Sequence, residues 1–284
     1  MTGERVGALE SGMGGASVRT AVKKLYIYVV LLLIVLVFSV ARLDQVDFFG
    51  PGHFLSASSV VNMLRGAAPI LTVSGAFTLL MISGYIDLSV GSAMSLAAVV
   101  FALLVREGAP LVVALPAALL LGGGCGLLNG FLVMRLRITP VIATLVTLNL
   151  FKGVALLIVP DGLSAIKSIP GQPMPGRIND YARADVLVGL PWAFFVAVLV
   201  IVGLVVAQRR TLLGKYAAAI GGNRTAAELS GIDPVRWVWL LYVMVGVCAA
   251  LAGVARASYM SLGDPLSGDG TELDCIIAVP AKIS

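Results

Sequence analysis

Four polar residues stand among apolar or small neighbours in this chain, and they are its first candidates for chemistry. Asp87 lies in a segment rich in Gly and Ser, 83–92. Asn129, Asn149 and Lys152 lie within long apolar runs, and Lys152 follows Asn149 by three residues. At that spacing the two side chains share one face of a helix.

Each of these residues permits a functional and a structural interpretation. Charged groups are costly in an apolar environment, so they are candidates for the lining of a transport pathway. Asp87 could instead accept amide hydrogen bonds at the start of the following helix, and Lys152 could extend its ammonium group towards water. The sequence leaves both alternatives open.

No set of residues typical of an enzyme accompanies them. The only histidine, His53, has no zinc-type partner, and the chain contains no HExxH, no Gly-x-Ser-x-Gly and no P-loop. We therefore expect no catalytic activity, no metal and no cofactor. If the chain transports a solute, the energy must come from an ion gradient or from a partner.

The elements that hold these residues are predicted to be membrane-spanning helices. A mean hydropathy of +1.00 with only 12% charged residues excludes a water-soluble domain of this length. A span needs about 20 apolar residues, and seven runs approach that length. We expect an all-α, polytopic helical bundle with spans at about 25–41, 60–82, 86–105, 110–134, 140–159, 190–207 and 237–256.

The distribution of basic residues predicts an orientation. With the N-terminus inside, the cytoplasmic segments hold eleven Lys and Arg against five in the outer loops, as the positive-inside rule requires. The net charge of +5 then needs no nucleic-acid partner. Residues 1–24 are expected to form a flexible cytoplasmic tail, and 25–284 a transmembrane domain.

Small residues predict where helices approach closely. Gly122, Gly126 and Gly130 recur every four residues on one face of the fourth run. This spacing allows two backbones to pack against each other in lipid. It is common in membrane bundles, so it favours a compact bundle without indicating a function.

One polar segment, 208–236, separates the last two runs. Its central part, 217–232, is rich in small residues, and Ala226–Leu229 is predicted to form a short helix that Gly231 and Pro234 terminate. Small side chains would let such a helix lie in a groove of another protein. The segment is therefore the best candidate for a contact in water.

This segment resembles the cytoplasmic coupling loop of ABC importer permeases of the ribose, xylose and arabinose family. The family's loop reads approximately Gly-Asn-x-Glu-Ala-Ala-x-x-Ser-Gly-Ile, and residues 222–232 read Gly-Asn-Arg-Thr-Ala-Ala-Glu-Leu-Ser-Gly-Ile. Thr225 replaces an acidic residue. Further similar segments are 86–92, Asn129-Gly130, 139–145, Lys152-Gly153 and 270–274.

The resemblance implies a permease that moves a monosaccharide across a bacterial inner membrane. It implies a cytoplasmic ATPase that binds the loop, an extracytoplasmic sugar-binding protein, a second permease copy and surrounding lipid. The loop residues carried over are Gly222, Asn223, Ala226, Ala227, Glu228, Ser230 and Gly231. Family members continue beyond the matched region, 55–278, with about three more helices. We therefore expect a truncated copy, with about seven of ten spans.

Two alternatives remain at this stage. The same machinery could carry nucleosides or branched-chain amino acids. A secondary transporter driven by ions is a second possibility, although it should show paired membrane carboxylates, and Asp87 has no such neighbour in the sequence.

Overall fold

The structure is a computed structural model, and it describes residues 26, 28–34, 36, 57–159, 166–167, 185–187 and 190–279. The chain divides into two compact units, Met1–Asn62 and Met63–Ser284. In the first unit, Tyr26 and the stretch 28–34 are helical and mostly exposed. The second unit holds a bundle of helices and the candidate site. The predicted tail 1–24, and His53, lie outside the described residues.

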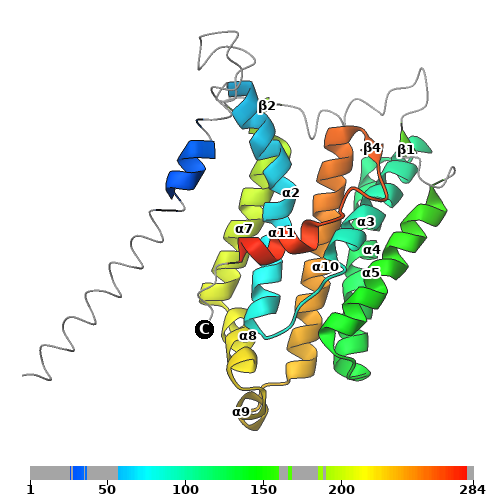
Figure 1. Cartoon of the computed structure of the whole chain (residues 1–284). Helices are drawn as coiled ribbons and strands as arrows, with labels where there is room; N and C mark the ends of the chain where they lie inside the picture. Colours follow the sequence, from blue (N-terminus) through cyan, green and yellow to red (C-terminus); the bar gives the residue numbers. More distant parts are fainter. Residues whose placement is uncertain are drawn as a thin grey trace, which may run out of the picture. The chain divides into compact units, whose positions relative to one another are not determined.

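Helices dominate the described parts of the chain, and the predicted all-α class is confirmed (Figure 1). The longer helices are α2 (Ala57–Ile82), α3 (Val90–Arg106), α4 (Leu111–Gly130), α5 (Pro140–Ile158), α7 (Trp192–Arg210) and α10 (Pro234–Met260). The shorter ones are the π-helix η1 (Phe131–Arg135), α8 (Leu212–Gly222), α9 (Arg224–Leu229) and α11 (Thr271–Ala278). The strands are two or three residues long: β1 (Ile166–Lys167) pairs with β4 (Leu262–Gly263), and β2 (Asp185–Leu187) with β3 (Leu190–Pro191).

The predicted count of seven spans is not confirmed. Four described helices are long and apolar enough to cross a membrane, namely α2, α4 with η1, α5 and α10. The bent pair α7 and α8 would make a fifth. Helix α3 has 17 residues, which rise only about 26 Å, and much of the first run, 25–41, lies outside the described residues.

Helix α3 is the most enclosed element of the bundle. Most of its residues are buried, and it packs against α4, α5 and α10. A helix that is apolar on every side is suited to such a central position. Its few polar groups find partners: Ser95 Oγ accepts a hydrogen bond from the backbone amide of Gly268, at 2.7 Å.

Helices α4 and α10 pack through the glycines that the sequence singled out. A Cβ added at Gly122 would overlap the carbonyl oxygen of Gly246, and one at Gly126 would overlap that of Tyr242. At Gly130 an added Cβ would overlap the ring of Trp239. All three glycines therefore face α10, and larger residues there would force the two helices apart.

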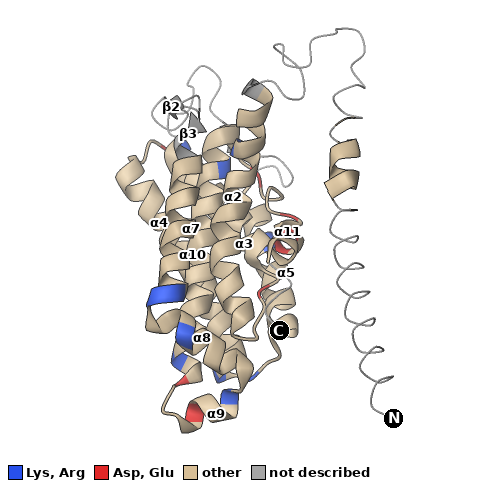
Figure 2. Ribbon diagram, turned by 90° about the vertical axis from the view of Figure 1, so that its left-hand side faces the viewer, with Lys and Arg blue, Asp and Glu red and all other residues tan. Residues whose placement is uncertain are grey.

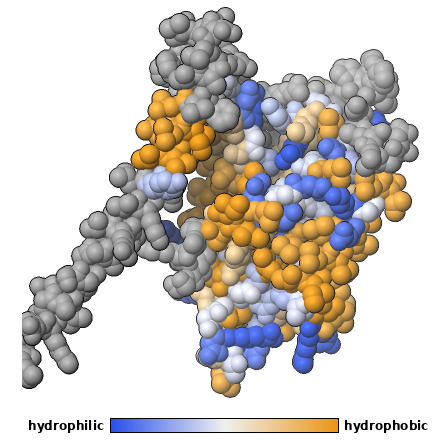
Figure 3. Space-filling view, viewed as in Figure 1, coloured by the Kyte–Doolittle hydropathy of each residue, from blue (hydrophilic) through white to orange (hydrophobic). Residues whose placement is uncertain are grey.

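The short helices α8 and α9 lie at one end of the bundle, at the bottom of Figure 1. Basic residues gather around α8 and α9 (Figure 2). Apolar side chains cover much of the visible face above them, whereas hydrophilic ones are frequent at the α9 end (Figure 3). This end also holds the break between α2 and α3.

Candidate functional site: the α8–α9 turn and the break beside it

The chain leaves α7 and turns into α8 through Thr211. The axes of α7 and α8 differ by 68°. Thr211 is the N-cap of α8 and accepts a hydrogen bond from the amide of Leu213, while its hydroxyl donates to the carbonyl oxygen of Ala207. Gly214 lies so close to the backbone of Gln208 that a Cβ would overlap it. The bend is therefore built into the local sequence.

Helix α9 is a single capped element. Asn223 begins it in an extended conformation, and its side-chain oxygen accepts a hydrogen bond from the amide of Ala226 at 3.0 Å. At the other end Ser230 Oγ donates to the carbonyl oxygen of Ala226, and Gly231 adopts φ +83°. That left-handed conformation favours glycine and ends the helix.

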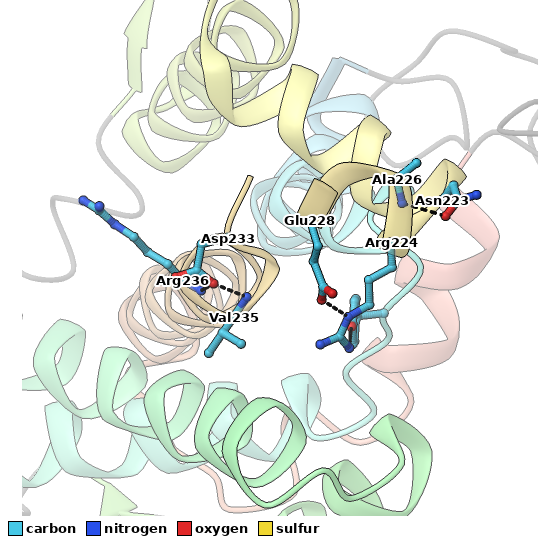
Figure 4. Close-up of polar contacts among 8 residues, drawn as sticks. Asn223, Arg224, Ala226, Glu228, Asp233, Val235 and Arg236 are labelled. Carbon is cyan, nitrogen blue, oxygen red and sulfur yellow. Dashed lines mark hydrogen bonds and ion pairs between the residues drawn. The ribbon is translucent and has the colours of Figure 1, made fainter. Parts of the chain in front are cut away.

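The next helix begins almost at once, which fixes the far side of the turn. Asp233 is the N-cap of α10 and accepts hydrogen bonds from the amides of Val235 and Arg236, at 2.9 and 3.3 Å. Pro234 occupies the first turn, where its missing N–H costs nothing. Figure 4 shows these caps beside α9.

Almost every residue of α9 is exposed. Ala227 is the exception, at 4% exposure, because it points into the bundle. Leu229, an apolar residue, is 86% exposed. The sequence-based list of loop residues omitted Leu229. An apolar residue at the end of a polar, Ala-rich helix was the sequence signal that could have identified it.

A pair of charged residues connects α9 to the break between α2 and α3. Arg224 Nε donates to Glu228 Oε1 at 3.0 Å (Figure 4), and Arg224 Nη1 donates to Tyr85 Oη at 3.0 Å. The hydrogen bond to Glu228 is the main cause that raises the pKa of Arg224. Tyr85 was not among the residues predicted from the sequence.

Helix α8 also touches this break directly. A Cβ at Gly221 would overlap the carbonyl oxygen of Ile82, the last residue of α2. The break and α9 enclose one side of a hollow of about 670 Å³, whose other side is formed by η1 and the segment before α5. Arg137, with φ +57°, lines that side. Motion of α8 or α9 would therefore change the break and the hollow.

Two of the predicted polar positions meet inside the bundle. Asp87 and Asn129 are 2% and 1% exposed, and Asn129 Nδ2 donates to Asp87 Oδ2 at 3.0 Å and to Ser89 Oγ at 2.7 Å. Asp87 Oδ1 accepts from the amide and the hydroxyl of Ser89. Asp87 thus joins the break to α4 as well as supporting the start of α3.

The other two predicted polar positions lie elsewhere on the molecule. Asn149 is exposed on α5 and donates to the carbonyl oxygen of Leu145. Lys152 Nζ lies 2.6 Å from Asp269 Oδ2, so it forms an ion pair with the segment before α11. The four residues are therefore not one cluster, and only Asp87 and Asn129 are bonded to each other, at the α2–α3 break.

Comparison with known proteins identifies the family. The model of the family described as "Branched-chain amino acid transport system / permease component" matches residues 59–279. The chain belongs to this family.

Three relatives bear names that describe the transport of D-allose or the import of autoinducer 2 or ribose. The chain is 32% identical to the D-allose transport system permease protein of Escherichia coli (strain K12), over 78% of this chain and 66% of that protein. It is 34% identical to the autoinducer 2 import system permease protein of Yersinia pseudotuberculosis serotype O:1b (strain IP 31758), over 64% and 54%. It is 32% identical to the ribose import permease protein of Bacillus subtilis (strain 168), over 80% and 68%.

These relatives confirm the resemblance to monosaccharide importer permeases. They are transporter subunits and not enzymes. The chain spans between about half and two thirds of the length of these relatives. No solved structure matches the chain.

Proposed function

We propose that this chain is the membrane-spanning permease of an importer driven by an ATP-binding-cassette ATPase, and that its substrate is a monosaccharide. The ATPase would be a separate cytoplasmic subunit, since the chain has no P-loop. A sugar-binding protein would deliver the substrate from outside, and a second permease copy would complete the pathway. The α9 end and the N-terminus would then face the cytoplasm.

One observation carries the proposal: α9 is a capped, exposed helix bonded to the break between α2 and α3. Its caps hold it in one conformation, all its residues except Ala227 are exposed, and Arg224 bonds it to Tyr85. An ATPase that binds Leu229 and its neighbours would act on the α2–α3 break through Arg224 and Gly221. Closure of the ATPase would thereby shift the bundle between two states.

The test is ATPase retention by the full chain, co-expressed with the ATPase and binding protein of its own transport system. Leu229→Asp should abolish co-purification of the ATPase and reduce sugar uptake to background, because it places a charge in an apolar contact. Leu229→Ala should give an intermediate result. Leu212→Asp is the matched control, since Leu212 is an exposed apolar residue of α8.

Unchanged ATPase retention by the Leu229→Asp protein would contradict the proposal. The substrate class is tested separately, by competition of unlabelled solutes with uptake in proteoliposomes. Branched-chain amino acids belong in that panel, because the family's description names them. Competition by leucine or isoleucine but not by monosaccharides would replace the sugar with an amino acid.

A further inference from the structure

A second candidate site lies at the end of the bundle opposite α9. A cavity of about 140 Å³ opens between α2 and α10 and is lined by Arg65, Gly66, Pro69, Ala255, Arg256, Tyr259 and Met260. Two arginine residues therefore line one small space. The proposed coupling function uses none of these residues.

The charge of Arg256 has no counterpart among the described residues. Its Nε atom is buried and makes no hydrogen bond, and no ion pair involves it in the described part of the chain. A buried cationic donor without an acceptor is costly. Arg65 lines the same cavity. The cavity therefore favours an anion.

The height of the cavity matches the headgroup region of a bilayer. Arg256 follows Pro234, the first residue of α10, by about six helical turns, or about 33 Å of rise. The hydrocarbon core is about 30 Å thick. Helix α10 thus carries Arg256 to the interface when its other end, next to α9, lies at the opposite surface.

The remaining lining residues are mainly apolar. Pro69, Ala255 and Met260 offer no hydrogen bonds from their side chains, and Tyr259 combines a ring with a hydroxyl. A ligand that satisfies both kinds of surface carries an oxyanion next to an apolar portion. Guanidinium groups bind phosphate oxygens with two parallel hydrogen bonds.

We propose that this cavity binds the phosphate group of an anionic membrane phospholipid, with Arg256 as the main ligand. The bound lipid would hold the ends of α2 and α10 together in the leaflet opposite α9. The site is independent of the ATPase contact and of the transported solute.

The experiment compares thermal unfolding of the full chain in phosphatidylcholine nanodiscs with and without phosphatidylglycerol. The anionic lipid should raise the melting temperature of the wild type, and native mass spectrometry should show it bound. Arg256→Gln should lose that increment and weaken lipid binding about tenfold, the size of one charge-assisted hydrogen bond. Arg106→Gln is the matched control, because Arg106 forms an ion pair with Glu107 at the same end of the bundle.

Two further variants keep the test decisive if Arg256→Gln does not fold. Arg256→Lys retains the charge and should keep part of the increment, whereas Ala255→Leu fills the cavity and should remove it with both arginines intact. Inorganic phosphate, titrated into lipid-free detergent, separates the two sources of the oxyanion. Stabilisation by phosphate but not by phosphatidylglycerol would overturn the lipid as the ligand and replace it with a soluble anion.

The proposal is wrong if phosphatidylglycerol and phosphate both leave the wild type unchanged. It is equally wrong if lipid stabilises the wild type and the Arg256→Gln and Ala255→Leu proteins to the same extent.

Discussion

The two polar regions at the α9 end are built in opposite ways. Helix α9 is exposed, and its caps are local, with Asn223 and Ser230 each bonding Ala226 within four residues. The α2–α3 break is buried, and Asp87 is bonded to Asn129, 42 residues away. The local element can meet a partner without disturbing the fold, whereas the non-local one holds two helices in register.

The largest effect on stability is expected from a substitution that removes the hydrogen bonds of the buried α2–α3 break. Asp87→Ala leaves the amide of Ser89 and one N–H of Asn129 without their acceptor, which should cost roughly 3 kcal/mol of stability. Thermal unfolding of the purified chain measures the loss. Asp87→Asn is the control: Asn129 Oδ1 has no hydrogen-bond partner, so its amide can rotate and accept from the new side chain. An equal loss in both variants would show that the charge matters more than the bonds.

The next largest effect should come from the end of α9. Gly231 has φ +83°, and a β-branched side chain there should cost about 1–2 kcal/mol. Gly231→Val should therefore misplace α9 and reduce ATPase retention, while most of the bundle remains folded. Gly231→Asn is the matched control, because asparagine tolerates the left-handed conformation that valine does not. An equal fall in ATPase retention in both variants would show that the left-handed conformation at Gly231 does not matter for ATPase binding.

Removing the hydrogen bond between Arg224 and Tyr85 tests whether α9 and the α2–α3 break act together. Tyr85→Phe deletes only the hydroxyl that accepts from Arg224, and an exposed bond of this kind should contribute less than about 1 kcal/mol to stability. Uptake should fall although the ATPase still binds, because the bond joins α9 to the break. Normal sugar uptake by this variant would show that α9 acts on the break through the contact at Gly221 alone.

The smallest effect is expected at Thr225. Thr225→Glu puts an acidic group in the first turn of α9, where the resembled family carries one, and should stabilise the helix by roughly 0.3–1 kcal/mol. Hydrogen exchange of the α9 amides should slow, and the global melting temperature should not change. Faster exchange would mean that the new carboxylate competes with Glu228 for Arg224.

Local features were predictable from the sequence, and non-local ones were not. The short helix expected at Ala226–Leu229 is present as α9, since its caps lie within a few residues of it. Helix α8 was not predicted from the sequence, because three glycines, Gly214, Gly221 and Gly222, favour a loop. Two of those glycines instead allow close backbone contacts.

The sequence pattern did not indicate contacts between distant segments. Asp87 and Asn129 were chosen as separate polar positions, and nothing in their spacing indicated a hydrogen bond. The same holds for Lys152 and Asp269, 117 residues apart. The span count also depended on tertiary structure, because α3 is shorter than a full span and α8 bends away from α7.

Because the chain bends at Thr211, α8 could tilt about that residue as a rigid arm. Its 11 residues form an arm about 16 Å long, and a tilt of about 10° about Thr211 would move the far end by about 3 Å. Gly221, near that far end, already touches the carbonyl group of Ile82. If the ATPase displaces α9, the contact at Gly221 is therefore a direct route from that displacement to the end of α2.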